Sequence, residues 1–110
     1  MGSKGARGKT AGIEAAAALE QTLEPLGVRS RAMFGGHGLF KDDVMFAIVD
    51  SEGRLYLRAD ATTAVAFEAA GSTQHARMPY WELPEPVRAD DEQLREWAAT
   101  AAEVAIKGRR

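Results

Sequence analysis

Residues 33–49 read MFGGHGLFKDDVMFAIV, and this stretch decides the fold. It carries three glycines near its start, a Lys-Asp-Asp group in its middle and six consecutive apolar residues at its end. Residues 37–41 and 44–49 have the length of β-strands, and the second is apolar on both faces, as a covered central strand is. Asp tolerates the left-handed backbone of a tight turn, so Lys41-Asp42-Asp43 predicts the connection between the two strands.

The glycines of this stretch could serve either a ligand or the backbone itself. GGHG leads into a strand and not into a helix, so it offers a phosphate no helix N-terminus of the kind found in dinucleotide-binding loops. We therefore interpret Gly35, Gly36 and Gly38 as a structural turn, needed where a Cβ would clash between strands. His37 lies in the same loop, His75 is the only other histidine, and their spacing predicts no metal site.

The alternation of side chains predicts further strands around this pair. Residues 28–34 alternate between arginine-bearing and small or apolar positions, and residues 54–58, RLYLR, follow a turn at 50–53. Residues 72–88 are harder to assign, because only 72–78 could hold one short strand. The prolines of PYWELPEP favour extended or turning chain over a helix there.

Helical periodicity marks two segments outside the strands. Apolar residues at steps of three and four predict a helix over 10–26 that ends at Gly27. A second helix is predicted over 61–70, capped by Asp60 and ended by Gly71.

A third helix begins after Asp90, which matches a capping box with Gln93, and runs to about Lys107. Asp91 and Arg95 are spaced as a favourable ion pair on it. The predicted order gives one two-layer α+β domain, in which three helices cover a mainly antiparallel sheet of four or five strands.

The predicted domain spans residues 10–107, between a disordered basic tail at 1–9 and a basic tail at 108–110. The net charge is −2, but all 16 acidic residues lie between Glu14 and Glu103 beside only eight basic ones, a net charge of −8 for that span. A duplex-binding domain normally presents a basic face, so we expect weak or no direct binding to nucleic acid. The basic ends leave open an alternative in which they contact nucleic acid as flexible arms.

Composition excludes several other classes. The sequence has no cysteine, which rules out disulfides, thiolate zinc sites and a cysteine nucleophile. It has neither a secretory signal nor an apolar run of about 20 residues, so we expect a cytoplasmic protein without a membrane segment. Residues 5–10, GARGKT, resemble the end of a nucleotide-binding loop, but Ser3 stands where that motif needs glycine. We predict no catalytic residues, no cofactor and no enzyme activity.

One predicted sheet face is suited to binding a partner. Arginine and tyrosine anchor many interfaces through stacking and forked hydrogen bonds. The same residues could equally be an exposed face whose charges prevent aggregation. The candidate face consists of Arg29, Arg31, Arg54, Tyr56 and Arg58.

A resemblance to a known family rests on five pieces in order: RAMFGGHGLFKDDVMFAIV, GRLYLRAD, FEAAG, MPYWELP and LREWAATAAEVA. Over roughly residues 28–105 the chain resembles the N-terminal domain of the TfoX/Sxy family, regulators of bacterial DNA uptake, or competence. The resemblance implies a compact α+β fold of the type also seen in secretion chaperones. It also implies that longer members help the cyclic-AMP receptor protein activate competence promoters. Those members carry a second, C-terminal helical domain, for which we expect no room here.

These observations favour a non-enzymatic protein-interaction domain that influences transcription or competence through a partner. The partner is expected to be another protein, such as part of the transcription machinery, or a second copy of the chain as a homodimer. Two alternatives remain open at this point: direct nucleic-acid binding through the arginine face and basic tails, and small-molecule sensing in a pocket with convergent polar groups.

Overall fold

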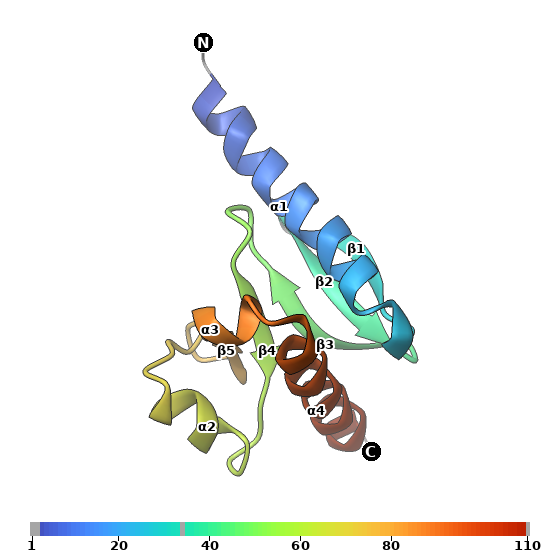
Figure 1. Cartoon of the computed structure of the whole chain (residues 1–110), viewed down its shortest axis with the longest axis vertical. Coiled ribbons are helices and arrows are strands. Elements are labelled where there is room, and N and C mark those ends of the chain that lie inside the picture. The colour runs from blue at the N-terminus through green and yellow to red at the C-terminus, as the bar shows by residue number, and fades with distance from the viewer. Residues whose placement is uncertain (1–2, 34, 110) are drawn as a thin grey trace.

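The computed structural model describes the backbone of residues 3–33 and 35–109, and the side chains of these residues from position 10 onward (Figure 1). Over these described residues the fold is α+β with a five-stranded sheet, as predicted, and it has four α-helices where three were expected. The elements are α1 (Ser3–Thr22), the 3₁₀ helix η1 (Glu24–Leu26), β1 (Arg29–Met33), β2 (Gly36–Lys41), β3 (Val44–Val49), β4 (Leu55–Arg58), α2 (Ala64–Ala69), β5 (Tyr80–Glu82), α3 (Glu85–Arg88) and α4 (Asp91–Arg109).

The strands form a simple antiparallel meander in the order β1-β2-β3-β4-β5. The prediction that residues 44–49 are the central strand is confirmed. Asp42 and Asp43 have φ angles of 52° and 65°, so both adopt the left-handed backbone that the turn between β2 and β3 requires.

A β-bulge breaks the alternation of side chains in β3. Leu39 pairs with Ala47 but the next residue, Phe40, pairs with Met45, so Phe46 is an extra residue with no partner on β2. Phe46 and Ala47 are consecutive, yet both are fully buried. Because a bulge turns two neighbouring side chains toward one face, it fits both residues into the same core.

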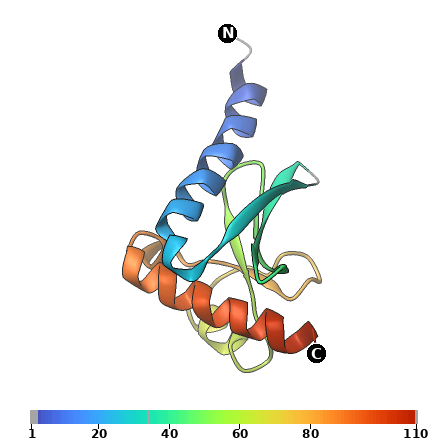
Figure 2. The same cartoon turned by 90° about the vertical axis from the view of Figure 1, so that its right-hand side faces the viewer.

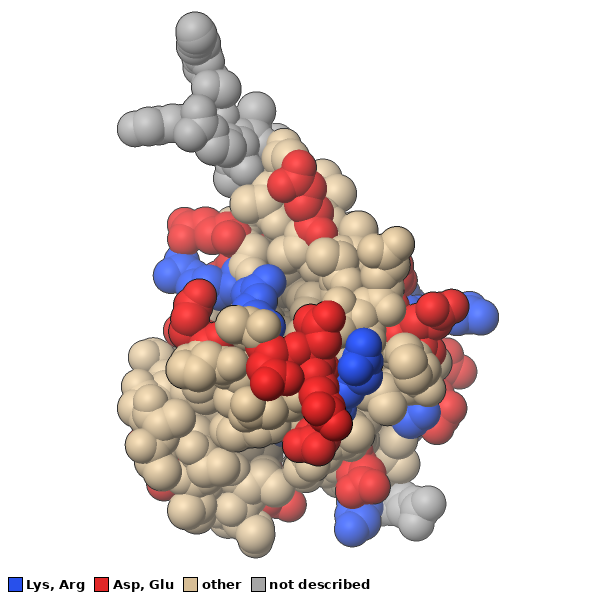
Figure 3. Space-filling model, in the orientation of Figure 1, with Lys and Arg blue, Asp and Glu red and all other residues tan. Residues whose placement is uncertain are grey.

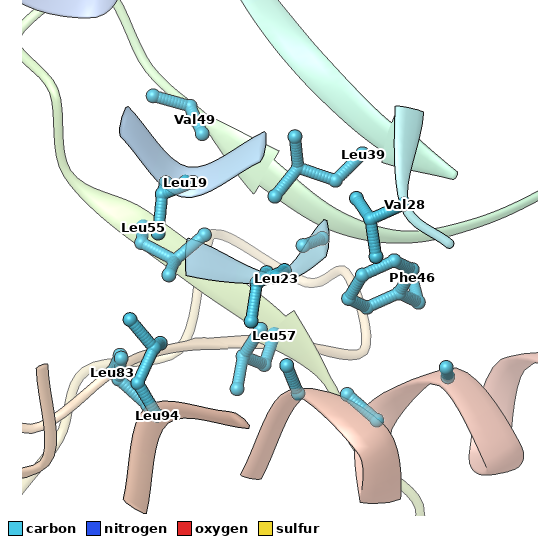
Figure 4. Packing of buried hydrophobic residues seen from close by; sticks show 14 of the residues in the cluster. Leu19, Leu23, Val28, Leu39, Phe46, Val49, Leu55, Leu57, Leu83 and Leu94 are labelled. Atoms are coloured by element: carbon cyan, nitrogen blue, oxygen red, sulfur yellow. The ribbon is translucent and has the colours of Figure 1, made fainter. Parts of the chain in front are cut away.

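Helices cover one face of this sheet. α1 packs across β1 and β2, and α4 packs across β3 and β4, as the two views in Figures 1 and 2 show. Small residues in α4 let it approach the strands closely, and leucines of α1 fill the space above them (Figure 4). The core includes Leu19, Leu23, Leu39, Phe46, Val49, Leu55, Leu57, Leu94, Ala98, Ala101 and Ala105.

The ends of α1 differ from the prediction. The helix begins at Ser3 and not after Thr10, because extending an existing helix adds hydrogen bonds without a second nucleation step. At its other end the regular helix stops at Thr22, and the segment around Pro25 continues as η1. Gly27 ends it with φ 74°, as predicted, and donates its N–H to the carbonyl of Glu24.

The segment between β4 and α4 holds the main local corrections. α2 is shorter than predicted, since Asp60 caps a turn at 61–63 by accepting the N–H of Thr63. Only Gln74 of residues 72–78 forms a bridge, to Trp81, and the strand β5 lies later. The PEP segment was predicted to be non-helical, but α3 begins within it, because proline is well tolerated in the first turn of a helix.

The start of α4 agrees with the prediction. Asp90 accepts the backbone N–H groups of Glu92 and Gln93, and the Gln93 side chain donates back to Asp90. Arg95 does not form the predicted ion pair with Asp91 and binds α1 instead. Within residues 3–33 and 35–109, no helix combines the length and hydrophobicity needed to cross a membrane.

Candidate functional site

The face of the sheet opposite α1 and α4 is the candidate site, and no described helix covers it. Its side chains alternate with the buried ones. On β2, Phe40 follows buried Leu39, and on β4, Tyr56 lies between buried Leu55 and Leu57. We call this surface the open face; its members are Arg29, Arg31, Met33, Phe40, Met45, Ile48, Tyr56 and Glu82.

Gly38 sits at the middle of the open face and leaves room for two methionines. A Cβ placed on it would lie 2.8 Å from Sδ of Met45, 3.2 Å from Sδ of Met33 and 3.0 Å from the ring of Phe40. Side chains from three strands therefore converge over one glycine. Thioether side chains are flexible and polarizable, so such a group adapts to partners of different shape.

A hollow of about 450 Å³ lies beside these methionines. Its wall is the segment before β5: His75 packs edge-on against the ring of Tyr56 with 4.7 Å between ring centroids, and Met78 lines the opening with 40% of its surface exposed. Backbone and side-chain hydrogen bonds hold this wall in place, from His75 N to Tyr80 O and from Gln74 Nε2 to Met78 O. The hollow is mainly apolar and can accept an apolar side chain.

Two of the predicted arginines border this apolar surface. Arg29 and Arg31 lie on β1 and are exposed, and the Arg31 guanidinium stands 4.9 Å from the centroid of the Phe40 ring. Among the residues that the structure describes, neither has a carboxylate within 4.0 Å. Their charge is therefore available to an acidic group from outside.

Arg54, also predicted for this face, is engaged in the preceding turn. Its Nε lies 3.0 Å from Oδ2 of Asp50, and its Nη2 contacts Glu52. The hydrogen bond and charge of Asp50 raise the pKa of Arg54. Burial, followed by the charge of Asp50, raises the pKa of Tyr56, whose hydroxyl lies 3.5 Å from the same carboxylate. The charge of Arg54 is thus compensated within the turn.

Arg58 does not belong to the open face. Its guanidinium reaches α4, where a Cβ on Gly108 would lie 3.1 Å from Nη2, and it lines the space between α2 and α4. The structure thus brings Arg29, Arg31 and Tyr56 onto one face, places Arg54 beside Tyr56 but paired with Asp50, and places Arg58 elsewhere. The sequence did not predict the hollow. The bulge at Phe46 interrupts the alternation of side chains in β3, so the pattern does not show that Met45 lies on the same face as Met33.

The glycines at the start of β2 have geometric roles. Gly35 has φ 79°, in the tight connection between Met33 and its pairing partner Gly36. A Cβ on Gly36 would overlap the backbone carbonyl oxygen of Val49 on β3. His37 lies beside them, and its buried Nδ1 has no hydrogen-bond partner among the described residues. In that same part of the chain, no three residues of the types His, Cys, Asp and Glu are grouped to hold a metal ion.

Comparison with known proteins assigns this fold to a family. The sequence matches the family described as the TfoX N-terminal domain over residues 20–105, from the last turn of α1 into α4. The chain belongs to the TfoX N-terminal domain family. A relative, the DNA transformation protein TfoX1 of Aliivibrio fischeri, is 49% identical over 41 residues. That alignment covers 37% of this chain and 19% of the relative, so the chain spans only a small part of the protein it matches.

Proposed function

We propose that this TfoX N-terminal domain is a non-enzymatic protein-interaction domain that acts in DNA-uptake competence or its transcriptional control through a protein partner. Membership of the family and the similarity to a DNA transformation protein support the biological role. The open face supports the mode of action, because it is an apolar sheet surface with no described helix upon it. The observation that carries the proposal is the methionine-lined hollow on a sheet face that also carries Arg29 and Arg31.

The chemistry of the open face defines the partner. The hollow accepts one apolar or aromatic side chain as an anchor, and such anchors in desolvated pockets supply most of the binding energy of protein interfaces. Arg29 and Arg31 stand on the outer strand β1 of the same face and can form forked hydrogen bonds with carboxylates elsewhere on the bound segment. The partner segment is therefore apolar at its centre and acidic on one side.

A photo-cross-linking experiment in the native host tests this proposal. A photoreactive amino acid is placed at Arg31 or Met78 on the open side, or at Val65 on α2, which is 60% exposed and lies away from it. We expect the two open-face positions to capture the same protein and Val65 to capture little of it. No cross-linked protein at either open-face position, or equal capture at Val65, would contradict the proposal.

A purified partner then allows the surface to be measured directly. Exchange of Met45 for Leu keeps an apolar side chain in the hollow, whereas exchange of Met45 for Gln makes the hollow polar. We expect Met45→Gln to weaken the partner at least about tenfold and Met45→Leu to have little effect, since buried polar groups without partners are costly. Circular dichroism confirms that both variants remain folded.

Direct nucleic-acid binding stays the alternative because Arg29 and Arg31 lack described carboxylate partners. The side of the molecule shown in Figure 3 carries many acidic groups and, among its described residues, no continuous basic surface. A titration with duplex DNA at several salt concentrations separates the two functions. Binding that weakens steeply with salt and persists without residues 1–9 and 108–110 would favour the nucleic-acid function, and no binding at low salt would remove it.

A further inference from the structure

A cleft separate from the open face is lined by residues of α2 and α4. It consists of two hollows of about 640 and 320 Å³, and Arg58 lines both of them. We infer that this cleft binds a small organic monoanion with an aromatic body, whose carboxylate or equivalent group is held by Arg58. This inference is independent of the proposed function of the open face.

Arg58 has the properties of an anion-binding residue. Its Nε is buried and has no hydrogen-bond partner among the described residues, and no described carboxylate lies within 4.0 Å of it. A buried N–H without an acceptor destabilises a protein, so such groups are usually satisfied by a ligand, water or another residue. The planar guanidinium matches the two oxygens of a carboxylate in a forked arrangement.

The surroundings hold Arg58 in place and add a second positive charge. Gly108 lacks a Cβ and leaves space for the guanidinium in the last turn of α4. Arg58 also lies near the hydroxyl of Tyr80, which donates to the carbonyl oxygen of Met45 at 3.3 Å. Lys107, one helix position before Gly108, lines the larger hollow. Two cationic side chains therefore come together in a chain whose net charge is negative.

Aromatic and apolar side chains define the body of the ligand. Phe67 stands between both tryptophans of the sequence: its ring is stacked near Trp81 at 6.3 Å and meets Trp97 edge-on at 5.0 Å. Trp81 lines the larger hollow, and Phe67 and Trp97 line the smaller one. Aromatic walls prefer a flat, apolar ligand that can stack on them or meet their edges.

Two carboxylates limit the charge of the ligand. Asp60 lines the larger hollow, where it accepts hydrogen bonds from Thr63, and exposed Glu96 lines the smaller one. These negative charges repel a doubly charged phosphate more strongly than a single carboxylate. With Arg58 and Lys107 the charges of the cleft nearly cancel, so a dianion gains little, and the aromatic walls favour an aromatic monocarboxylate over inorganic phosphate.

Nuclear magnetic resonance tests the inference with the intact chain. The two indole N–H signals and the Arg58 Nε–H signal are followed while 2-naphthoate is added, in parallel with uncharged 2-naphthylmethanol and with inorganic phosphate. We expect 2-naphthoate to shift all three signals and to bind at least about tenfold more tightly than the alcohol, as a charge-assisted hydrogen bond implies. Phosphate is expected to leave the indole signals unchanged.

Variants separate Arg58 from general charge effects. Arg58→Met is expected to lose about tenfold or more in affinity for 2-naphthoate, whereas Arg54→Met, which removes the same charge in the turn after β3, keeps the original affinity. Equal affinity for 2-naphthoate and the alcohol, or unchanged binding in Arg58→Met, would overturn the inference. If Arg58→Met does not fold, the comparison of the charged and uncharged compounds on the unaltered chain decides the question.

Discussion

Arg95 in α4 donates a hydrogen bond from Nε to the carbonyl oxygen of Thr22, the last residue of α1, at 2.9 Å. The two residues are 73 positions apart in the sequence, so this bond joins the helices at opposite ends of the chain. The last carbonyl groups of a helix have no partner within it and need one from elsewhere. Lys41 likewise caps the end of η1, because its Nζ donates a hydrogen bond of 2.6 Å to the carbonyl oxygen of Leu26.

We predict that Arg95→Met lowers the free energy of unfolding by about 1–3 kcal/mol, since it removes a charged donor from a part-buried carbonyl but keeps most of the side-chain volume. Urea denaturation measures the change. Arg77→Met is the matched control, because Arg77 is exposed and has no hydrogen bond or ion pair among the described residues. Equal stability of the two variants would show that the bond to Thr22 contributes nothing.

The glycines of β2 provide a graded test of the geometric interpretation. A Cβ at position 36 would overlap the backbone of Val49, which cannot move without disturbing β3, whereas at position 38 it would press against flexible methionine ends. Gly36→Ala should therefore lower the free energy of unfolding by at least about 1–3 kcal/mol, and Gly38→Ala by less. If chemical denaturation shows a larger loss of stability for Gly38→Ala than for Gly36→Ala, then β2 and β3 do not approach closely at Gly36.

The turn between β2 and β3 can be improved. Asp43 has φ 65°, a conformation that glycine adopts without steric cost. Asp43→Gly is expected to raise the free energy of unfolding, by less than about 1 kcal/mol because glycine also gains freedom in the unfolded chain. Asp43→Val should instead destabilise the protein, and thermal unfolding of the pair measures both effects.

Stability at acidic pH should depend on the cap of α4. Hydrogen bonds from Gln93, first from its backbone and then from its side chain, lower the pKa of Asp90 from its usual 3.8. A lowered folded-state pKa means that the stabilisation is complete above the ordinary value and is lost as pH falls through the lowered one. Asn at position 90 still caps the helix but does not titrate. When the pH is lowered below about 4, the melting temperature of Asp90→Asn should therefore fall less than that of the original chain. Identical acid profiles would contradict this role.

Local signals predicted much of this structure. Asp42, Asp43 and Gly27 act through their own backbone preferences, and Asp90 acts on residues two and three positions away, so the sequence around each was sufficient. α3 was missed because prolines were taken to exclude a helix, whereas Pro84 is its N-cap and Pro86 lies in its first turn.

Long-range contacts explain what the sequence could not predict. Alternation along β4 placed the Cβ atoms of Tyr56 and Arg58 on the same side of the strand. The guanidinium of Arg58 nevertheless reaches Gly108 of α4, away from the open face. Similarly, Arg95 has a well-spaced acidic neighbour in its own helix and still binds Thr22. The hollow beside Met45 depends on a bulge and on the wall before β5, and neither feature has a local pattern.

Binding of a protein partner to the open face is tested by the affinity of the purified partner for two variants that each change the net charge by the same amount. Arg31→Gln alters the open face, and Gln21→Glu alters the exposed side of α1; each lowers the net charge by one. Calorimetry should show a loss of about tenfold for Arg31→Gln, as expected for removal of a charged hydrogen-bond donor, and no loss for Gln21→Glu. Equal affinities of both variants for the partner would contradict the account.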